Sequence, residues 1–419
     1  MKIQRKIFSE IKNQIGSNKI LILRWPRQVG KTTLMKQLQN TLKTQNTVFL
    51  SLDNLDLSNK IQTPSDLFNY LKFEYSYDKS KKLYLFLDEF QNIKQSWLFL
   101  KNIYDEHENI KLICSWSSSL EITKNTEFLT WRKFVFDISS FNFSEYLHAK
   151  SFKNYNIKFN IKTDFDKLES FNSTYKYELK WYFYEYLLIW WYPDVVLSSN
   201  KDRQYIIKDI VDTYIKKDIT QFLKIENVLA FNNLVKLLSS RIWNLINKTE
   251  INWIIWTSIN TLNKYIDILI WTYVFSFVSP YYSNVKKEIV KMQKVFCNDL
   301  WMRNYLLYGK IEKLPISDIW KLVENFIYNE LSNMDNYSLN IYQTISKSEI
   351  DFIFSKNYNK LIPIEVKYRN KVNFPTAIKN FEKRYKKKID KKIIFTKNII
   401  KKNSNTYYIP SYLIPFVKI

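Results

Sequence analysis

Gly30, Lys31, Thr32 and Thr33 form a short polar stretch that could bind phosphate. They follow an apolar run, Ile20–Leu23, that is typical of a buried strand, and they lead into a segment with helical spacing. A strand, a tight loop and a helix provide what phosphate requires, because loop N–H groups wrap the anion and the helix N-terminus adds its positive dipole end. Lys31 would then reach the β- and γ-phosphates, and Thr32 would hold Mg²⁺.

The loop before this stretch departs from the expected pattern at one position. The phosphate-loop motif G-x-x-x-x-G-K-[ST] places glycine first, and this chain has Trp25 there. A crowded first position would weaken phosphate binding without abolishing it. We predict that the whole loop contacts ATP. Its residues are Trp25, Pro26, Arg27, Gln28, Val29, Gly30, Lys31, Thr32 and Thr33.

Two carboxylates follow the apolar run Leu83–Leu87. We predict that Asp88 holds Mg²⁺ with Thr32 and that Glu89 activates the attacking water, so the reaction would be ATP hydrolysis. An acidic strand end with no chemistry is the alternative. Ser117 follows a later strand and would either contact the γ-phosphate or form an ordinary turn. Arg132 would either stabilise transferred charge or lie on the surface.

A second set of polar residues lies near the C-terminus: Glu330, Asp351, Glu365 and Lys367. Their order resembles the restriction-endonuclease-like nuclease fold, in which a helix glutamate precedes a hairpin bearing Asp, and Glu-x-Lys follows on the next strand. The resemblance implies that Glu330, Asp351 and Glu365 bind a second Mg²⁺, with Lys367 orienting water or stabilising phosphate charge. Alternating charges on a half-buried strand pair are the alternative.

The charge of the chain points to a polyanionic partner such as DNA. Its 419 residues carry a net charge of +24. The residues from Lys356 to Lys402 include sixteen basic and three acidic side chains, which is more than half of the excess. Compositional bias from an A+T-rich genome would spread the excess evenly. We therefore expect a phosphate-backbone surface in this segment.

Glycine and tryptophan occur in unusual numbers: 3 glycines against 13 tryptophans. Glycine permits positive φ and close backbone approach, and tryptophan opposes both. We hypothesise that the source organism reads UGA as glycine and that the sequence was translated with UGA as tryptophan. A genuine tryptophan-rich protein is the alternative. If the hypothesis holds, Trp25 and Trp256 should lie in loop or turn geometry.

Composition argues against several classes of protein. The segment Met1–Ile15 is charged throughout and lacks the apolar region of a signal peptide. No uncharged apolar run approaches the roughly 20 residues of a membrane helix. Two cysteines and two histidines argue against a disulfide framework and against a structural zinc site. We expect a cytoplasmic protein with no membrane partner, and we leave a homo-oligomer open.

The periodicities predict an α/β chain. Five apolar runs alternate with helical patterns through about residue 140, which favours a mostly parallel sheet covered by helices on both faces. They are Ile20–Leu23, Thr47–Leu52, Leu83–Leu87, Lys111–Cys114 and Phe134–Ile138. A helical, aromatic-rich pattern follows to about Leu223. Strands return from Tyr273, with one clear helix over Lys321–Leu331.

The segment Leu245–Ile268 reads as a helix-turn-helix with Trp256 at its turn. Thr257 and Ser258 would cap a third helix that could enter a DNA major groove. A domain-packing module is the alternative. That helix carries Asn260, Thr261, Asn263 and Lys264.

The chain as a whole resembles a prokaryotic AAA-type ATPase family with a C-terminal domain of unknown function. The similarity rests on Arg24–Leu38, Leu87–Gln91, Ser117–Leu120 and Phe141–Leu147, with shorter matches to Phe326. The family pattern has glycine at many of the tryptophans. They are Trp25, Trp116, Trp131, Trp190, Trp191, Trp256 and Trp301, and also Trp97, Trp243, Trp271 and Trp320.

The patterns and the resemblance together predict four parts and an ATPase. They are a P-loop ATPase domain (1–150), a helical region (151–230), a winged-helix-like module (231–275) and a nuclease-like α/β domain (276–419). Its cofactors would be ATP and Mg²⁺, and it would act with or on DNA. Two alternatives stay open: a nucleotide-switched DNA-binding protein with little turnover, and an ATP-regulated Mg²⁺-dependent nuclease.

Overall fold

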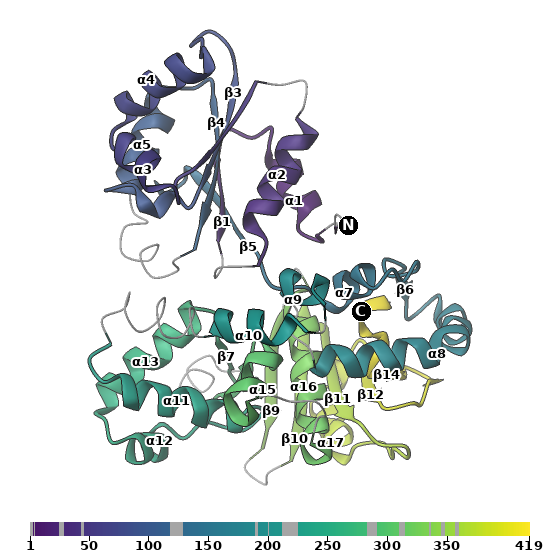
Figure 1. The fold of residues 1–419 in the computed structure, drawn as a ribbon. Helices are drawn as coiled ribbons and strands as arrows, with labels where there is room; N and C mark the ends of the chain where they lie inside the picture. The colour runs from purple at the N-terminus through teal and green to yellow at the C-terminus, as the bar shows by residue number, and fades with distance from the viewer. Residues whose placement is uncertain are drawn as a thin grey trace. The chain divides into compact units, whose positions relative to one another are not determined.

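The protein is described by a computed structural model (Figure 1). It covers residues 3, 5–24, 29–42, 46–117, 129–188, 192–199, 201–211, 225–282, 291–309, 315–334, 337–344, 348–356 and 360–419. Contacts divide the chain into two units. The first unit consists of residues 1–141, 192–225 and 271–273, and the second of residues 142–191, 226–270 and 274–419.

The first unit is built on a parallel five-stranded sheet in the order β2-β3-β4-β1-β5. The strands are β1 Ile20–Arg24, β2 Thr47–Ser51, β3 Leu83–Asp88, β4 Ile110–Trp116 and β5 Lys133–Asp137. All five predicted strands are therefore confirmed. Every residue of β3 and β4 is buried. Strands covered on both faces have this pattern, which is why they read as continuous apolar runs.

Helices flank this sheet on both sides, as Figure 1 shows. α1 and α2 lie on one side, and α3, α4 and α5 on the other. Their bounds are α1 Phe8–Gln14, α2 Lys31–Thr41, α3 Leu55–Lys60, α4 Pro64–Tyr75 and α5 Ser96–Glu106. Local sequence sets their starts: Thr63 and Asp66 form a capping box at α4, with Pro64 in the first turn. Two later helices, α9 Pro193–Leu197 and α10 Arg203–Val211, also belong to this unit.

The second unit begins with α7 Phe143–Ala149, the short strand β6 Phe159–Asn160 and the long helix α8 Phe165–Leu188. Aromatic rings join α7 and α8 to α16 Ile316–Ser332. Phe143 meets Phe326 edge to face at 5.8 Å between ring centroids, and Phe183 meets Phe326 at 4.9 Å. The predicted helical region 151–230 is thus split, because α8 packs in the second unit while α9 and α10 pack in the first. The predicted domain limits stay a proposal.

Three helices and a strand pair follow one another as the helix-turn-helix prediction requires. They are α11 Val228–Ser240, α12 Lys248–Ile255, α13 Ile259–Trp271, β7 Phe275–Val278 and β8 Lys294–Cys297. β7 and β8 are antiparallel. The link between α11 and α12 lies along β8, since Ile246 N donates to Gln293 O at 2.9 Å and Val295 N donates to Asn244 O at 3.2 Å. The link therefore bridges to β8 of the two-stranded β7–β8 sheet through Leu245 and Lys294.

A six-stranded mixed sheet forms the rest of the second unit, in the order β13-β14-β12-β11-β10-β9. β9, β10 and β11 are antiparallel neighbours, while β11, β12 and β14 are parallel. Helix α16 confirms the helix predicted over Lys321–Leu331, and α15 and α17 are two further helices that the sequence did not predict. Bounds are α15 Leu300–Tyr308, β9 Ser338–Gln343, β10 Glu349–Lys356, β11 Lys360–Lys367, α17 Thr376–Tyr385, β12 Lys392–Thr396, β13 Lys401–Asn403, β14 Thr406–Pro410 and β15 Val417–Lys418.

Tryptophan occupies three of the positive-φ positions in the described chain. Trp131 has φ 64°, Trp243 has φ 74° and Trp256 has φ 53°. Trp256 ends α12 in the left-handed conformation, as predicted for that turn. Left-handed backbone costs L-residues roughly 1–2 kcal/mol each, so it favours glycine. Trp25, Trp190 and Trp191 lie outside the described residues, and Trp97, Trp116, Trp301 and Trp320 lie within ordinary helices or strands.

None of the helices in the described ranges has the length and apolar character needed to cross a membrane.

Candidate functional site

The phosphate-loop stretch opens α2, as its sequence predicts. Gly30 is the N-cap and adopts φ 89°. A Cβ there would stand 3.6 Å from Cγ of Pro193, and the positive φ would strain any side chain. Lys31 is buried in the first turn, with Thr32 and Thr33 after it. The first part of the predicted loop, residues 25–28, lies outside the described residues.

Asp88, the last residue of β3, bonds the start of α2. Its Oδ2 accepts a 2.6 Å hydrogen bond from the Thr32 hydroxyl. The Ser115 hydroxyl on β4 donates to its other oxygen, Oδ1. Asp88 is only 3 % exposed. Hydroxyl groups thus bind both of its carboxylate oxygens. The oxygens of Thr32 and Asp88 are adjacent, and they are ligands of the kind that Mg²⁺ prefers.

Glu89 follows Asp88 with a left-handed backbone, φ 54°. Its N–H donates to Ser115 Oγ at 2.8 Å. Its two carboxylate oxygens accept hydrogen bonds from the Ser117 hydroxyl and from the Gln91 side-chain amide. Non-glycine residues with positive φ cluster at functional sites, where the surrounding structure fixes them. Ser117, predicted as a γ-phosphate contact, is therefore first of all a partner of Glu89.

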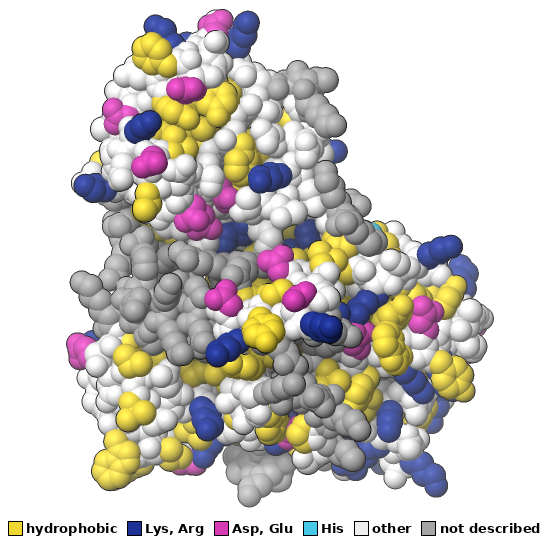
Figure 2. All heavy atoms as spheres, in the orientation of Figure 1, with side chains coloured by type: hydrophobic (Ala, Val, Ile, Leu, Met, Phe, Trp, Pro, Cys, Tyr) yellow, Lys and Arg dark blue, Asp and Glu magenta, His cyan; other side chains and the backbone are white. Residues whose placement is uncertain are grey.

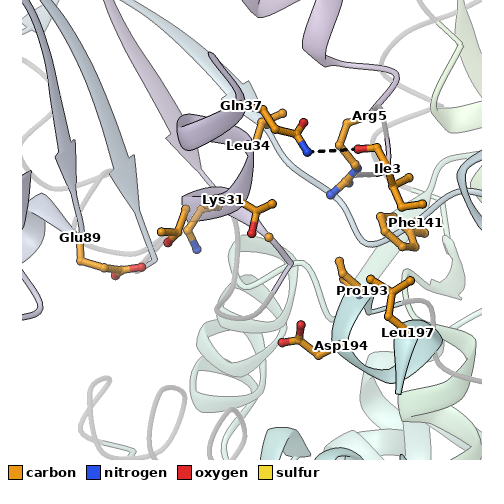
Figure 3. A pocket seen from close by; sticks show the side chains of 13 residues that line it. Ile3, Arg5, Lys31, Leu34, Gln37, Glu89, Phe141, Pro193, Asp194 and Leu197 are labelled. Carbon is orange, nitrogen blue, oxygen red and sulfur yellow. Dashed lines mark hydrogen bonds between the residues drawn. The ribbon is translucent and has the colours of Figure 1, made fainter. Parts of the chain in front are cut away.

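Lys31, Thr32 and Glu89 line a cavity of about 380 Å³ in the first unit. Figure 3 shows Lys31 and Glu89 on one side and Ile3, Arg5 and Phe141 on the other, with Asp194 of α9 below. Burial raises the pKa of Asp194 above its usual value. The cavity thus has a charged end at the phosphate loop and a mixed end where Ile3 and Phe141 lie with Arg5 and Asp194, which suits a phosphorylated ligand with a ring system.

Arg5 is a site residue that the sequence did not reveal. Its Nη1 donates to Val29 O at 2.9 Å, and its Nη2 donates to the carbonyl of Ser139. The guanidinium also lies 5.1 Å from the ring centroid of Phe141. Arg5 therefore ties the residue before Gly30 to the chain after β5. A lone arginine near an N-terminus carries no motif, so only tertiary packing identifies it.

Arg132 is not brought to this cavity, so the prediction of a catalytic role was wrong. Its guanidinium forms a paired ion bridge with Asp105, at 2.7 and 3.1 Å. Its carbonyl accepts from Ile20 N, at the beginning of β1. The phosphate loop follows the other end of β1, since Arg24 is that strand's last residue. A strand length therefore separates Arg132 from the loop.

Three of the four C-terminal residues meet on neighbouring strands. Asp351 lies on β10, and Glu365 and Lys367 lie on β11. Asp351 Oδ2 accepts from Val366 N at 2.7 Å, and Lys367 Nζ stands 2.5 Å from Glu365 Oε1. Burial and the nearby Asp351 charge raise the pKa of Glu365 to about 8. Asp351 and Lys367 line a cavity of about 510 Å³ in the second unit.

Glu330 does not join them; Glu324, on the same helix α16, does. Glu330 Oε1 accepts from Phe143 N at 3.1 Å, at the beginning of α7. Glu324 lines the cavity with Asp351, and burial and the Asp351 charge raise its pKa well above the usual value. The prediction of a second magnesium site is therefore wrong about Glu330, the residue that it took from the helix.

A lysine stands among these carboxylates. Lys294, 2 % exposed, pairs with Glu349 and lies 4.0 Å from Glu324. In the part of the chain that the structure describes, no three His, Cys, Asp or Glu side chains are grouped so as to hold a metal ion. The arrangement therefore does not fit the predicted metal, and ammonium groups balance the charge instead.

Comparison with known families addresses the first unit most directly. Residues 17–147 match the family model of an AAA domain. The five-stranded sheet, the phosphate loop and the Asp88–Glu89 pair all lie within the matched residues. Two further models match, both described as domains of unknown function: DUF8612 over residues 180–312 and DUF4143 over residues 320–414. Neither names a nuclease.

Individual relatives are distant. A Haemophilus influenzae protein described as uncharacterized is 23 % identical over 348 residues, which is 80 % of each chain. Among solved structures, a mutant of Thermotoga maritima RuvB has TM-score 0.29 at 13 % identity and covers 64 % of this chain and 86 % of that one. C. elegans PCH-2 has TM-score 0.25 at 14 % identity, over 38 % of this chain and 48 % of that one. This chain thus spans about half of the PCH-2 chain.

Proposed function

We propose that the AAA domain binds ATP with Mg²⁺ and hydrolyses it. The observation that carries this proposal is the 2.6 Å hydrogen bond between Thr32 and Asp88, beside the buried Lys31. Two hard oxygen ligands next to a phosphate-loop lysine suit a metal ion that would accompany the phosphates. When bound, Mg²⁺ would neutralise charge on the phosphates. Thr32 and Asp88 would hold it.

Glu89 is the base in this proposal. It follows Asp88 directly and lines the same cavity as Lys31 and Thr32. Ser117 and Gln91 fix the direction of its carboxylate. A positioned carboxylate that takes a proton from water speeds hydrolysis by roughly 10²–10⁴-fold. Arg5 supports the loop through its hydrogen bond to the Val29 carbonyl.

DNA is the partner that we propose for the second unit. The wing formed by β7 and β8 beside α11, α12 and α13 supports a winged-helix-like module, and Asn260 and Lys264 lie on α13. The net charge of +24 favours a polyanion. The alternative is a nucleotide-switched DNA-binding protein that turns over little ATP.

ATPase assays with and without DNA test these proposals. Lys31→Ala should lose nucleotide binding, because this lysine is the cation that the phosphate-loop motif supplies to the phosphates. Glu89→Gln should keep binding and lose turnover. Both variants are compared in the unchanged chain and in a Trp25→Gly background. Equal hydrolysis by Glu89→Gln and the unchanged chain would remove Glu89 from the mechanism, and binding without turnover in the unchanged chain would favour the switch.

For the C-terminal sheet we propose a nuclease-like scaffold without metal-dependent cleavage. Asp351 and Glu365 lie on adjacent strands, as a nuclease-like fold requires, but within the described residues the carboxylates do not form a metal-binding group. We derive no metal-dependent step from them. Cleavage assays on several DNA forms, with Asp351→Ala as control, test this directly.

A further inference from the structure

Helix α8 carries an exposed stripe of aromatic side chains in the second unit. Tyr177 is 79 % exposed, Trp181 61 % and Tyr184 41 %. Their spacing of four and three residues puts them on one face of the helix. The opposite face is buried through Leu179 and Phe183. Three large rings in water on one helix face are unusual for a surface with no partner.

Lysines border this stripe on one side. Lys176 and Lys180 are one turn apart on α8, and Lys176 Nζ stands 5.3 Å from the ring centroid of Tyr177. Lys397, which follows β12, faces the same region: burial, Lys176 and Lys397 together lower the pKa of Lys180. Three ammonium groups that repel one another favour an anionic ligand between them. On the other side Glu185 pairs with Lys150 at 2.7 Å, so its charge is balanced.

The stripe is continuous with the rim of the 510 Å³ cavity. Lys397 Nζ stands 5.8 Å from the ring centroid of Tyr368, and burial together with the nearby Tyr184 of the stripe raises the pKa of Tyr368. Tyr368, Arg369 and Lys397 all line the cavity. A basic and aromatic path therefore leads from the cavity rim onto α8. Figure 2 shows hydrophobic and basic side chains interspersed over this helix.

We propose that this path, defined by Tyr177, Lys180, Trp181, Tyr184, Arg369 and Lys397, binds single-stranded nucleic acid. Its lysines would contact phosphates while its rings stack on unpaired bases. Single strands are bound by this combination of stacking rings and a basic track. A duplex hides the faces of its bases, so it could not use the rings. The proposal rests on the nucleic-acid partner proposed above and is independent of ATP hydrolysis.

Fluorescence anisotropy with a labelled oligothymidylate tests the path in the full chain without nucleotide. Tyr177→Ala and Trp181→Ala should each weaken binding about tenfold, because stacking on one ring contributes that order of affinity. Phe73→Ala on α4 is the matched control, since Phe73 is an equally exposed ring (82 %) outside the path. It should bind as the unchanged chain does. Melting curves check that all variants are folded.

Lysine variants test the phosphate contacts separately. Lys180→Gln and Lys397→Gln should each make the salt dependence shallower, by about 0.7 in the slope of log Kd against log salt for each phosphate that is no longer bound. An RNA oligomer of the same length distinguishes the two kinds of strand. Wild-type affinity in Trp181→Ala, or binding only to anionic phosphatidylserine vesicles, would overturn the proposal.

Binding measurements with a duplex of the same sequence distinguish a failure of this proposal from a failure of the proposed DNA partner. Binding to duplex alone, abolished in a Lys264→Ala variant of α13 and unchanged in Trp181→Ala, would overturn the path and keep the DNA partner. Binding to neither form would overturn both. Lys31→Ala should bind the single strand normally, so a failure of the ATPase proposal would leave this measurement intact.

Discussion

The hydroxyl of Thr32 and the carboxylate of Asp88 are joined by a 2.6 Å hydrogen bond across 56 residues of sequence. The bond links the first turn of α2 to the end of β3. We expect Asp88→Asn to raise the Mg²⁺ concentration needed for half-maximal ATPase activity, because an amide is a weaker ligand for Mg²⁺ than a carboxylate. A magnesium titration of ATPase activity measures this.

Asp105 provides the control for that prediction. It pairs with Arg132 on the surface, away from the cavity. Asp105→Asn and Arg132→Ala should both leave ATPase activity within about twofold of the unchanged chain, since exposed ion pairs contribute little. A large loss in Arg132→Ala would restore that arginine to the mechanism.

The serine that holds Glu89 gives a finer prediction. Removing the hydroxyl in Ser117→Ala frees one of the Glu89 carboxylate oxygens. We expect kcat to fall about 10-fold to 100-fold with the KM for ATP unchanged, because misplaced catalytic groups lose rate and not binding. Steady-state kinetics separate the two constants. An unchanged kcat would mean that Gln91 alone positions the base.

Trp256 tests the glycine hypothesis through stability. It is 85 % exposed and left-handed at the end of α12. Trp256→Gly should raise the free energy of unfolding by about 1 kcal/mol, because glycine adopts positive φ without strain. Denaturant unfolding followed by circular dichroism measures the change.

Trp253 is the matched control on the same helix. It is 71 % exposed but lies inside α12. Trp253→Gly should lower stability by about 1 kcal/mol, as glycine does in a helix interior. Destabilisation by both changes would count against the hypothesis, and mass spectrometry of the natural protein would decide it.

Asp299 makes stability depend on pH. Burial raises its pKa to about 7, although the N–H groups of Trp301 and Met302 donate to it. A carboxyl with a raised folded pKa binds more protons folded than unfolded. Stability should therefore fall as pH rises from about 4 to about 7 and change no further above that range.

Asparagine at this position keeps the helix cap and removes the charge. Asp299→Asn should lose this pH dependence and gain stability at pH 8 by an amount on the order of a few kcal/mol. Thermal melts of the two chains at several pH values between 4 and 8 test the prediction. Parallel curves for the two chains would contradict it.

The AAA domain was the most predictable part, for a physical reason. Parallel strands buried on both faces produce continuous apolar runs in the sequence. Gly30 and Asp88 mark the phosphate loop and the end of the strand that carries the carboxylates. The sequence could not predict the roles of Arg5 and Arg132, because each role depends on contacts with residues that are distant in the sequence. It favoured Glu330 over Glu324, which lie about 120° apart around α16. Only the packing of α16 on the sheet determines which of these faces the cavity.

The cavity beside the phosphate loop is completed by α9, which follows α8 in the chain. Pro193, Asp194 and Leu197 line it, yet residues 142–191 belong to the other unit. During synthesis, the phosphate loop therefore leaves the ribosome long before α9, the helix that completes the lining of its cavity. A fragment that ends at Phe141 would contain every motif of the nucleotide site and still lack part of its lining. Each unit is interrupted by segments of the other, so neither can be produced by a single cut in the chain.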